Sequence, residues 1–196
     1  VAEDHMMTTF WRRAHLYENG DILAIFEGLG LLKLDRNSNL IWANTGRAHH
    51  DLEVMPNGDI YVLTREAHLV PRHNKKEPIL EDFLLVLDPT ANEKRRVSLL
   101  AAFEGTRFAP LIRPVTRRAG DIFHTNTLTV LDGSAEEADP AFGAGNVMGY
   151  MLTLGVTAVV DPESGKIVWA RRGEPKFSHD PKILPSGNLL IFENLA

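Results

Sequence analysis

The sequence of 196 residues contains no cysteine, so it can form no disulfide framework and offers no thiolate for catalysis. It has no apolar run near the ~20 residues that a membrane-spanning helix needs, and we expect no membrane span. Positive charge is not in excess, because 21 Lys and Arg stand against 26 Asp and Glu, for a formal net charge of −5. Since nucleic-acid binding relies on clustered Lys and Arg, no nucleic-acid partner is expected.

Sustained helical periodicity is scarce as well. The apolar residues fall in short runs rich in Ile, Val, Leu and Phe, which are separated by Gly, Asn, Asp and Pro. This pattern is typical of short strands joined by turns. Residues 95–104 are the best helix candidate, with a strand followed by a turn as the alternative. The sequence therefore predicts an all-β fold.

The expected strands recur in one order: an Asn-Gly or similar turn, an outgoing strand, an Asp-containing turn and a closing strand. The units comprise 18–26 with 31–42, 56–63 with 83–99, 145–154 with 157–170, and a last unit that begins at 185–192. Four antiparallel strands repeating about every 40 residues are the signature of a β-propeller blade. A β-sandwich is the alternative, but it does not predict the recurrence of one unit.

The repeat runs along the whole chain, so we expect residues 1–196 to form a single β-propeller domain of about three and a half blades. Because propellers have 4–8 blades, this domain would be incomplete at its C-terminal end unless two chains cooperate as a homodimer. Trp42 and Trp169 lie at matching ends of their units. We expect both to pack between neighbouring sheets.

Three histidines precede a turn glycine by eight or nine residues: His50, His124 and His179. Arg12 holds the corresponding place in the first unit. The innermost strand of each blade lines the channel of a propeller, so we expect these side chains to point into one channel mouth. His49 follows the alternation of a strand and should face the other way from His50.

Clustered imidazoles allow several chemistries. A neutral ring can attack sulfur or phosphorus and form a covalent intermediate, and its neighbours can act as acid, base or anion binder. Alternatively, three imidazoles can hold zinc with one open coordination position. A non-catalytic propeller that binds a partner or a glycan is a third interpretation.

The same histidines carry a family resemblance. HHDxxxxPNGD at 49–59, HTN at 124–126 and HDxxxLPSGNLLIFEN at 179–194 resemble, in the same order, the bacterial arylsulfotransferase family. The resemblance covers the chain from about residue 10 to its end. It implies a propeller of six blades and a periplasmic or secreted enzyme. Such enzymes transfer a sulfuryl group from a phenolic sulfate ester to another phenol through a transiently sulfated histidine, with no metal or other cofactor.

By motif, the resemblance places the nucleophile at His179. It implies that His50 and His124 contact the sulfuryl and phenolic oxygens as acid–base partners, and that Asn126 orients the site. The aryl sulfate and the phenol would be the only partners that the reaction needs.

One position departs from the family pattern. MLTLGVTAVVD, residues 151–161, has Gly155 where the family has an arginine that would bind sulfuryl oxygens. A guanidinium is a permanent, bidentate clamp that histidine does not fully replace. Arg12, Arg47 and Arg65 are the candidates to take its place, with Arg12 on the expected inner strand. The missing arginine favours the non-catalytic alternative, and a metal-dependent hydrolase stays open as the last one.

Overall fold

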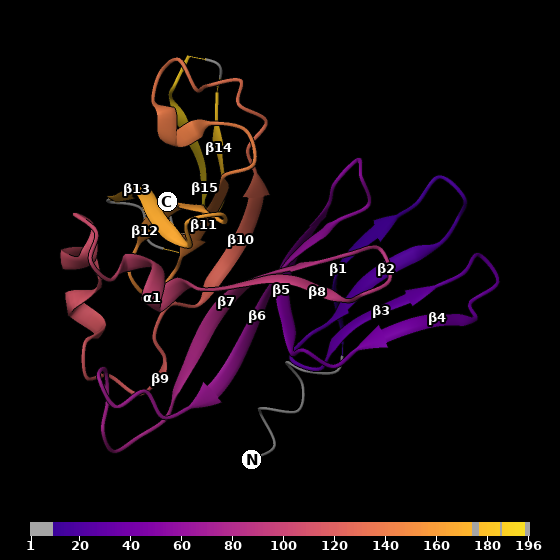
Figure 1. The fold of residues 1–196 in the computed structure, drawn as a ribbon, viewed down its shortest axis with the longest axis horizontal. Helices are drawn as coiled ribbons and strands as arrows, with labels where there is room; N and C mark the ends of the chain where they lie inside the picture. The colour runs from indigo at the N-terminus through magenta and orange to yellow at the C-terminus, as the bar shows by residue number, and fades with distance from the viewer. Residues whose placement is uncertain (1–9, 174–176, 185, 195–196) are drawn as a thin grey trace. The chain divides into compact units, whose positions relative to one another are not determined.

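The computed structural model describes residues 10–173, 177–184 and 186–194. Short β-strands make up about half of this part of the chain and helices very little of it (Figure 1), which confirms the all-β prediction. The chain divides into two compact units. The first unit holds the described residues up to Arg65 together with Phe83–Arg96, and the second holds Glu66–Asp82 together with the described residues from Val97 onward.

The first sheet is a four-stranded antiparallel meander in the first unit, ordered β1-β2-β3-β4. Its strands are β1 (Trp11–Leu16), β2 (Ile22–Phe26), β3 (Gly30–Leu34) and β4 (Leu40–Asn44). The β1–β2 turn contains Gly20 with φ of +88°. Only glycine adopts this left-handed conformation without strain, which explains the Asn-Gly turn predicted there.

The second sheet has the order β5-β6-β7-β8, and a short fifth strand pairs with β7. Its strands are β5 (Ala48–Val54), β6 (Ile60–His68), β7 (Ile79–Leu87), β8 (Glu93–Ser98) and β9 (Gly120–Asp121). A short helix, α1 (Leu99–Phe103), follows β8, and the Ser98 hydroxyl caps it by accepting the Ala101 N–H at 2.9 Å. Of the predicted helix over 95–104, the residues up to Ser98 belong to strand β8, and Leu99–Phe103 form helix α1.

The third sheet is again a four-stranded meander, ordered β10-β11-β12-β13, and a two-stranded sheet β14-β15 follows it. The strands are β10 (Thr125–Val130), β11 (Val147–Met151), β12 (Val156–Asp161), β13 (Lys166–Arg172), β14 (Ser178–Ile183) and β15 (Leu189–Glu193). Two 3-10 helices, η1 (Ala109–Val115) and η2 (Pro140–Phe142), lie in the connections. This repeat of four-stranded sheets matches the predicted three and a half blades.

The cores lie between sheets, as blade packing requires. In the first unit, buried side chains from β2, β3 and β5–β7 form one apolar cluster, and Trp42 packs against it. In the second unit, Trp169 packs against a cluster that includes Phe142, with the two ring centroids 5.3 Å apart. The expected packing role of both tryptophans is confirmed.

The turn between the third and fourth strands is built the same way in each complete sheet. Asp35, Asp88 and Asp161 each accept the main-chain N–H two residues further on, at 2.8, 2.8 and 2.9 Å. Side-chain and backbone hydrogen bonds, first of all from Asn92, lower the pKa of Asp88 to about 2. The pKa of Asp35 is lowered in the same way, chiefly by Asn39. Asp35 and Asp88 therefore hold their turns in the ionised form.

Candidate functional site

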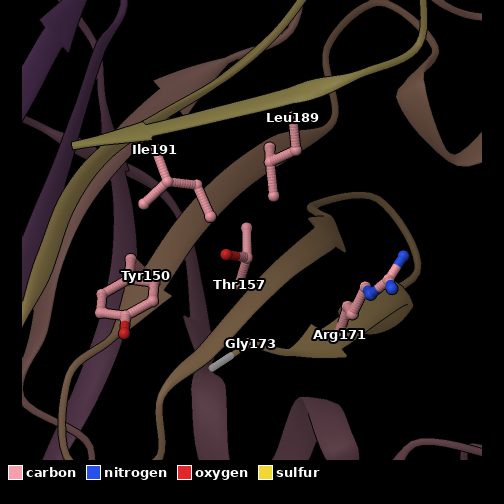
Figure 2. Close-up of a pocket in the computed structure, with 6 residues that line it drawn as sticks. All are labelled: Tyr150, Thr157, Arg171, Gly173, Leu189 and Ile191. Atoms are coloured by element: carbon pink, nitrogen blue, oxygen red, sulfur yellow. The ribbon is translucent and has the colours of Figure 1, made fainter. Parts of the chain in front are cut away.

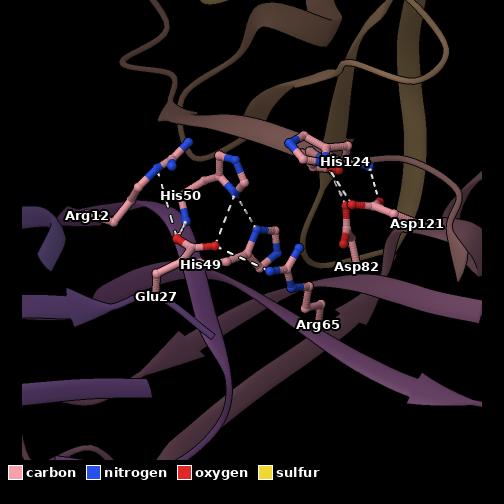
Figure 3. Close-up of polar contacts among 9 residues, drawn as sticks. Arg12, Glu27, His49, His50, Arg65, Asp82, Asp121 and His124 are labelled. Atoms are coloured by element: carbon pink, nitrogen blue, oxygen red, sulfur yellow. Dashed lines mark hydrogen bonds and ion pairs between the residues drawn. The ribbon is translucent and has the colours of Figure 1, made fainter. Parts of the chain in front are cut away.

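In the first unit, His50 lies on β5 beside a buried carboxylate (Figure 3). Its backbone N–H donates to Glu27 Oε2 at 3.1 Å, and its ring Nδ1 lies 3.9 Å from Glu27 Oε1. Both side chains are almost fully buried, with exposed fractions of 6% and 5%. Glu27 follows β2 directly and His50 lies on β5, so segments of two sheets build this cluster.

The His49 ring contacts the His50 ring, which sequence alternation did not predict. The two Nδ1 atoms are 2.9 Å apart and the rings meet edge to face. The expectation that His49 faces the opposite way is wrong, because His50 has φ of +55° and this left-handed residue interrupts the alternation. One Nδ1 must donate and the other accept, so the contact holds a single bridging proton.

Two guanidinium groups share the Glu27 carboxylate. Arg65 Nη2 lies 3.3 Å from Oε1, and Arg12 Nε lies 4.0 Å from Oε2. Arg12, predicted to bind substrate, therefore lies in the His50 cluster, and Arg65 joins it. Arg47 contributes its backbone carbonyl, which accepts the Arg65 N–H at 3.3 Å.

In the second unit, His124 is held by Asp121. The Asp121 carboxylate accepts the His124 backbone N–H at 2.8 Å and contacts Nδ1 at 2.7 Å. The buried Asp82 accepts the neighbouring Thr125 N–H at 2.8 Å. Sequence reasoning missed both carboxylates, although Asp121 stands three residues before His124 and could have been found as its partner.

His179 lies half-buried on β14. Its Nδ1 is 3.2 Å from the Phe177 carbonyl and 3.0 Å from Asn194 Nδ2. Asn126 Nδ2 donates to the Ser178 carbonyl at 2.9 Å, which places this predicted residue against the strand that carries His179. Within the second unit a side-chain to main-chain hydrogen bond thus links the HTN motif to the residue that precedes the HD motif.

The backbone register differs from the one predicted by residue counting. Thr125 pairs with Met151, and Ser178 pairs with Glu193, each partner lying four residues after its strand's first paired residue. Asn126 therefore corresponds to His179, and His124 corresponds to Phe177. His124 and Phe177 share a left-handed conformation, with φ of +50° and +59°. The predicted equivalence of His124 with His179 is wrong by two positions.

Strand β5 carries one residue more than β14 in its bulge. When β5 and β14 are aligned from their hairpin ends, His50 corresponds to His179, as predicted. When they are aligned from their other ends, where Ala48 pairs with Thr64 and Ser178 pairs with Glu193, His49 corresponds to His179 instead.

The three predicted histidines lie in different units of the chain. His50 belongs to the first unit, and His124 and His179 belong to the second. The convergence of all three on one channel stays a prediction.

Gly155 lies in the tight turn between β11 and β12. It has φ of +63°, its N–H donates to the Leu152 carbonyl at 3.2 Å, and its carbonyl accepts the Gly173 N–H at 3.0 Å. Arginine would be strained in this conformation. Arg47 and Arg117 bear the same kind of strain elsewhere in the chain, with φ of +53° and +70°, so this conformation disfavours an arginine at position 155 without excluding it.

A cavity of about 250 Å³ lies in the second unit (Figure 2). Leu189 and Ile191 of β15 provide apolar walls, and the other lining residues are Tyr150, Thr157, Arg171 and Gly173. No predicted site residue lines it.

Among the described residues, no helix has the length and apolarity to cross a membrane.

Comparison with known proteins agrees with this architecture. The chain resembles solved β-propellers: a streptogramin B lyase (11% identity, TM-score 0.55) and virginiamycin B lyase from Staphylococcus aureus (9%, TM-score 0.54). It also resembles a protein of unknown function from Bacteroides caccae (12%, TM-score 0.53). These matches cover 96%, 95% and 92% of this chain and 49%, 50% and 52% of the others. The chain thus spans about half the length of these structures, and the likeness shows the fold alone.

The fold is that of a β-propeller. His50 and His179 lie on the first strands of their sheets, and His124 directly precedes the first strand of a third sheet. The sequence matches the arylsulfotransferase (ASST) family model over residues 13–195. The chain therefore belongs to the arylsulfotransferase family, and the resemblance drawn from its three motifs is confirmed. No curated protein matches the sequence.

Proposed function

We propose that this protein transfers a sulfuryl group from a phenolic sulfate ester to a phenol through a sulfohistidine on His179. Family membership supports the reaction class. The observation that carries the proposal is that His124 and His179 each contact an oxygen acceptor through Nδ1. A ring that donates through Nδ1 carries its lone pair on Nε2, the atom that then acts as nucleophile or base.

His179 would supply the nucleophile. Its Nδ1–H donates to the Phe177 carbonyl, and the Asn194 side-chain amide lies against the same ring nitrogen. The lone pair on Nε2 attacks sulfur, the nitrogen–sulfur bond forms, and the bond from sulfur to the aryl oxygen breaks. The phenolate leaves with the electron pair of that bond. An acceptor phenoxide then attacks sulfur and returns the lone pair to Nε2.

His124 would move the proton. Its contact with Asp121 fixes the ring tautomer and stabilises the imidazolium that forms when Nε2 takes a proton. The imidazolium protonates the departing phenolic oxygen in the first half-reaction. The neutral ring then removes the proton of the acceptor phenol in the second half-reaction.

Arg12 and His50 would bind the sulfuryl oxygens, and Asn126 would orient the strand that carries His179. The carboxylate of Glu27 holds the Arg12 and Arg65 guanidinium groups beside His50. Permanent cations here would supply the charge that the family places at the position of Gly155. Losing one such oxyanion stabiliser typically lowers turnover by about 10²–10³.

The reaction needs no nucleotide donor and no cofactor, and by analogy with the family we place it in the periplasm or outside the cell. The test is incubation of the purified protein with nitrophenyl sulfate and an acceptor phenol. We expect nitrophenol and the sulfated acceptor in equal amounts, no transfer by His179→Asn, and full transfer by the control His15→Asn. A fully active His179→Asn variant would exclude this mechanism.

A non-catalytic propeller is the second candidate, and the glycine at position 155 favours it. Aryl sulfate that binds to the purified protein without any turnover would support that function instead.

A further inference from the structure

Glu27, His49 and His50 form a compact set of potential metal ligands in the first unit. Each residue offers one ligand atom, and these three atoms lie within 4.8 Å of one another. All three residues are buried: with backbone and side chain counted together, their exposed fractions are 3%, 0% and 9%. Two rings from neighbouring residues of β5 and a carboxylate that follows β2 are thus brought together around one point.

The distances suit a small cation. His49 Nδ1 and His50 Nδ1 are 2.9 Å apart, and His50 Nδ1 lies 3.9 Å from Glu27 Oε1. In a tetrahedral zinc site with bonds of about 2.0–2.1 Å, ligand atoms lie about 3.4 Å from one another. The two observed distances bracket this value, so shifts of about half an ångström would bring both pairs to it. The His49 and Glu27 ligand atoms lie within 4.8 Å of each other.

The protons can leave when an ion enters. The contact between the two Nδ1 atoms holds a single proton, as only one ring donates in it. A cation that binds both nitrogen lone pairs displaces that proton to solvent. Metal binding at this pair therefore releases protons and weakens as the imidazoles become protonated.

The surrounding charge selects the kind of cation. Arg12 and Arg65 already share the Glu27 carboxylate, so a hard cation such as Mg²⁺ or Ca²⁺ would find too few oxygen ligands. Imidazole nitrogen is a preferred ligand of Zn²⁺, Ni²⁺ and Cu²⁺. From this geometry we propose that Glu27, His49 and His50 bind one divalent transition-metal ion, and that this ion is Zn²⁺. The site goes beyond the proposed sulfuryl transfer, which requires no metal.

The test is equilibrium dialysis of the full, chelator-treated protein against Zn²⁺, with metal content measured by mass spectrometry. We expect one Zn²⁺ per chain, no uptake of Mg²⁺ or Ca²⁺, and at least tenfold weaker binding in His49→Gln, His50→Gln and Glu27→Gln. The control His15→Gln should bind as the parent does. Unchanged affinity in the three site variants, or no Zn²⁺ uptake by the parent, overturns the proposal.

A second measurement covers the case in which a variant does not fold. Co²⁺ added to the unaltered protein should give the visible absorption bands of a four- or five-coordinate nitrogen and oxygen site, and Zn²⁺ should abolish them. The weak bands of six-coordinate Co²⁺ would overturn the site. His179→Asn should bind Zn²⁺ normally while it loses transfer, so that failure of the metal site and failure of the proposed transferase are distinguishable.

Discussion

At the residue scale, a left-handed backbone conformation recurs where the candidate histidines lie. Among the described residues, non-glycine positions with left-handed φ include His50, His124, Phe177 and Asp180, all at the same end of the inner strands. Such conformations cost of order 1–3 kcal/mol each and persist where the surroundings enforce them. At His50 the Glu27 carboxylate provides that restraint, and at Asp180 the Thr127 hydroxyl does so by accepting its N–H at 3.1 Å.

Asp121→Asn should disable the proton transfer by His124. The asparagine oxygen can still accept the His124 backbone N–H, but the amide offers no charge to stabilise the imidazolium. We expect kcat to fall by about 10²–10⁴ with little change in KM. Initial rates with nitrophenyl sulfate check this, and Asp132→Asn, which alters a turn of the same unit, is the matched control. A kcat within a factor of two of the parent would exclude His124 as the acid–base group.

At the element scale, each inner strand carries a register shift near its beginning. These shifts fall between Trp11 and Ala14 in β1, Ala48 and Leu52 in β5, Thr125 and Thr127 in β10, and His179 and Lys182 in β14. Hairpins could be predicted from the sequence because Asn-Gly and Ser-Gly turns require particular residues. The bulges could not be predicted, because one extra residue in a strand changes neither composition nor alternation in a recognisable way.

The β3–β4 pair depends on the absence of a side chain at Gly30. A Cβ there would lie 2.0 Å from the Asn44 carbonyl oxygen, a main-chain atom that cannot move aside without separating the strands. Gly30→Ala should lower the free energy of unfolding by about 3 kcal/mol. Gly20→Ala, whose Cβ would meet only the Arg36 side chain at 3.2 Å, should cost about 1 kcal/mol.

Urea unfolding of both variants, followed by circular dichroism, measures the difference. Equal stability of Gly30→Ala and the parent would contradict the close approach of β3 to β4.

At the scale of the whole molecule, repetition was the property most readable from the sequence. The recurring turns predicted the all-β class, the four-stranded units and the packing role of Trp42. The three motifs identified the family. What the sequence did not show were the contacts between distant segments: Glu27 with His50, Asp82 with Thr125 and Asn126 with Ser178. These contacts depend on which strands become neighbours, and no local pattern encodes that.

Acid should weaken the aspartate turns at Asp35 and Asp88 and so lower the stability of the protein. The pKa values of Asp35 and Asp88 are lowered in the folded state, Asp88 to about 2, because their carboxylates accept turn hydrogen bonds. Their stabilising contribution is therefore complete above the unfolded pKa, about 3.9, and is lost as pH falls toward 2.

Thermal melting between pH 5 and pH 2 should show a falling Tm. We expect Asp88→Asn to reduce this decrease of Tm, and Glu163→Gln, which changes an exposed carboxylate, to leave the decrease unchanged. An unaltered slope in Asp88→Asn would remove this turn from the acid response.

The central claim, a covalent sulfuryl group on His179, is open to one direct measurement. The protein is mixed with nitrophenyl sulfate in the absence of acceptor, quenched at alkaline pH, digested and analysed by mass spectrometry. Our account predicts a peptide that carries one added SO₃ on His179 and loses it when phenol is supplied before the quench. Turnover without any modified histidine, or with the SO₃ on another residue, would contradict it.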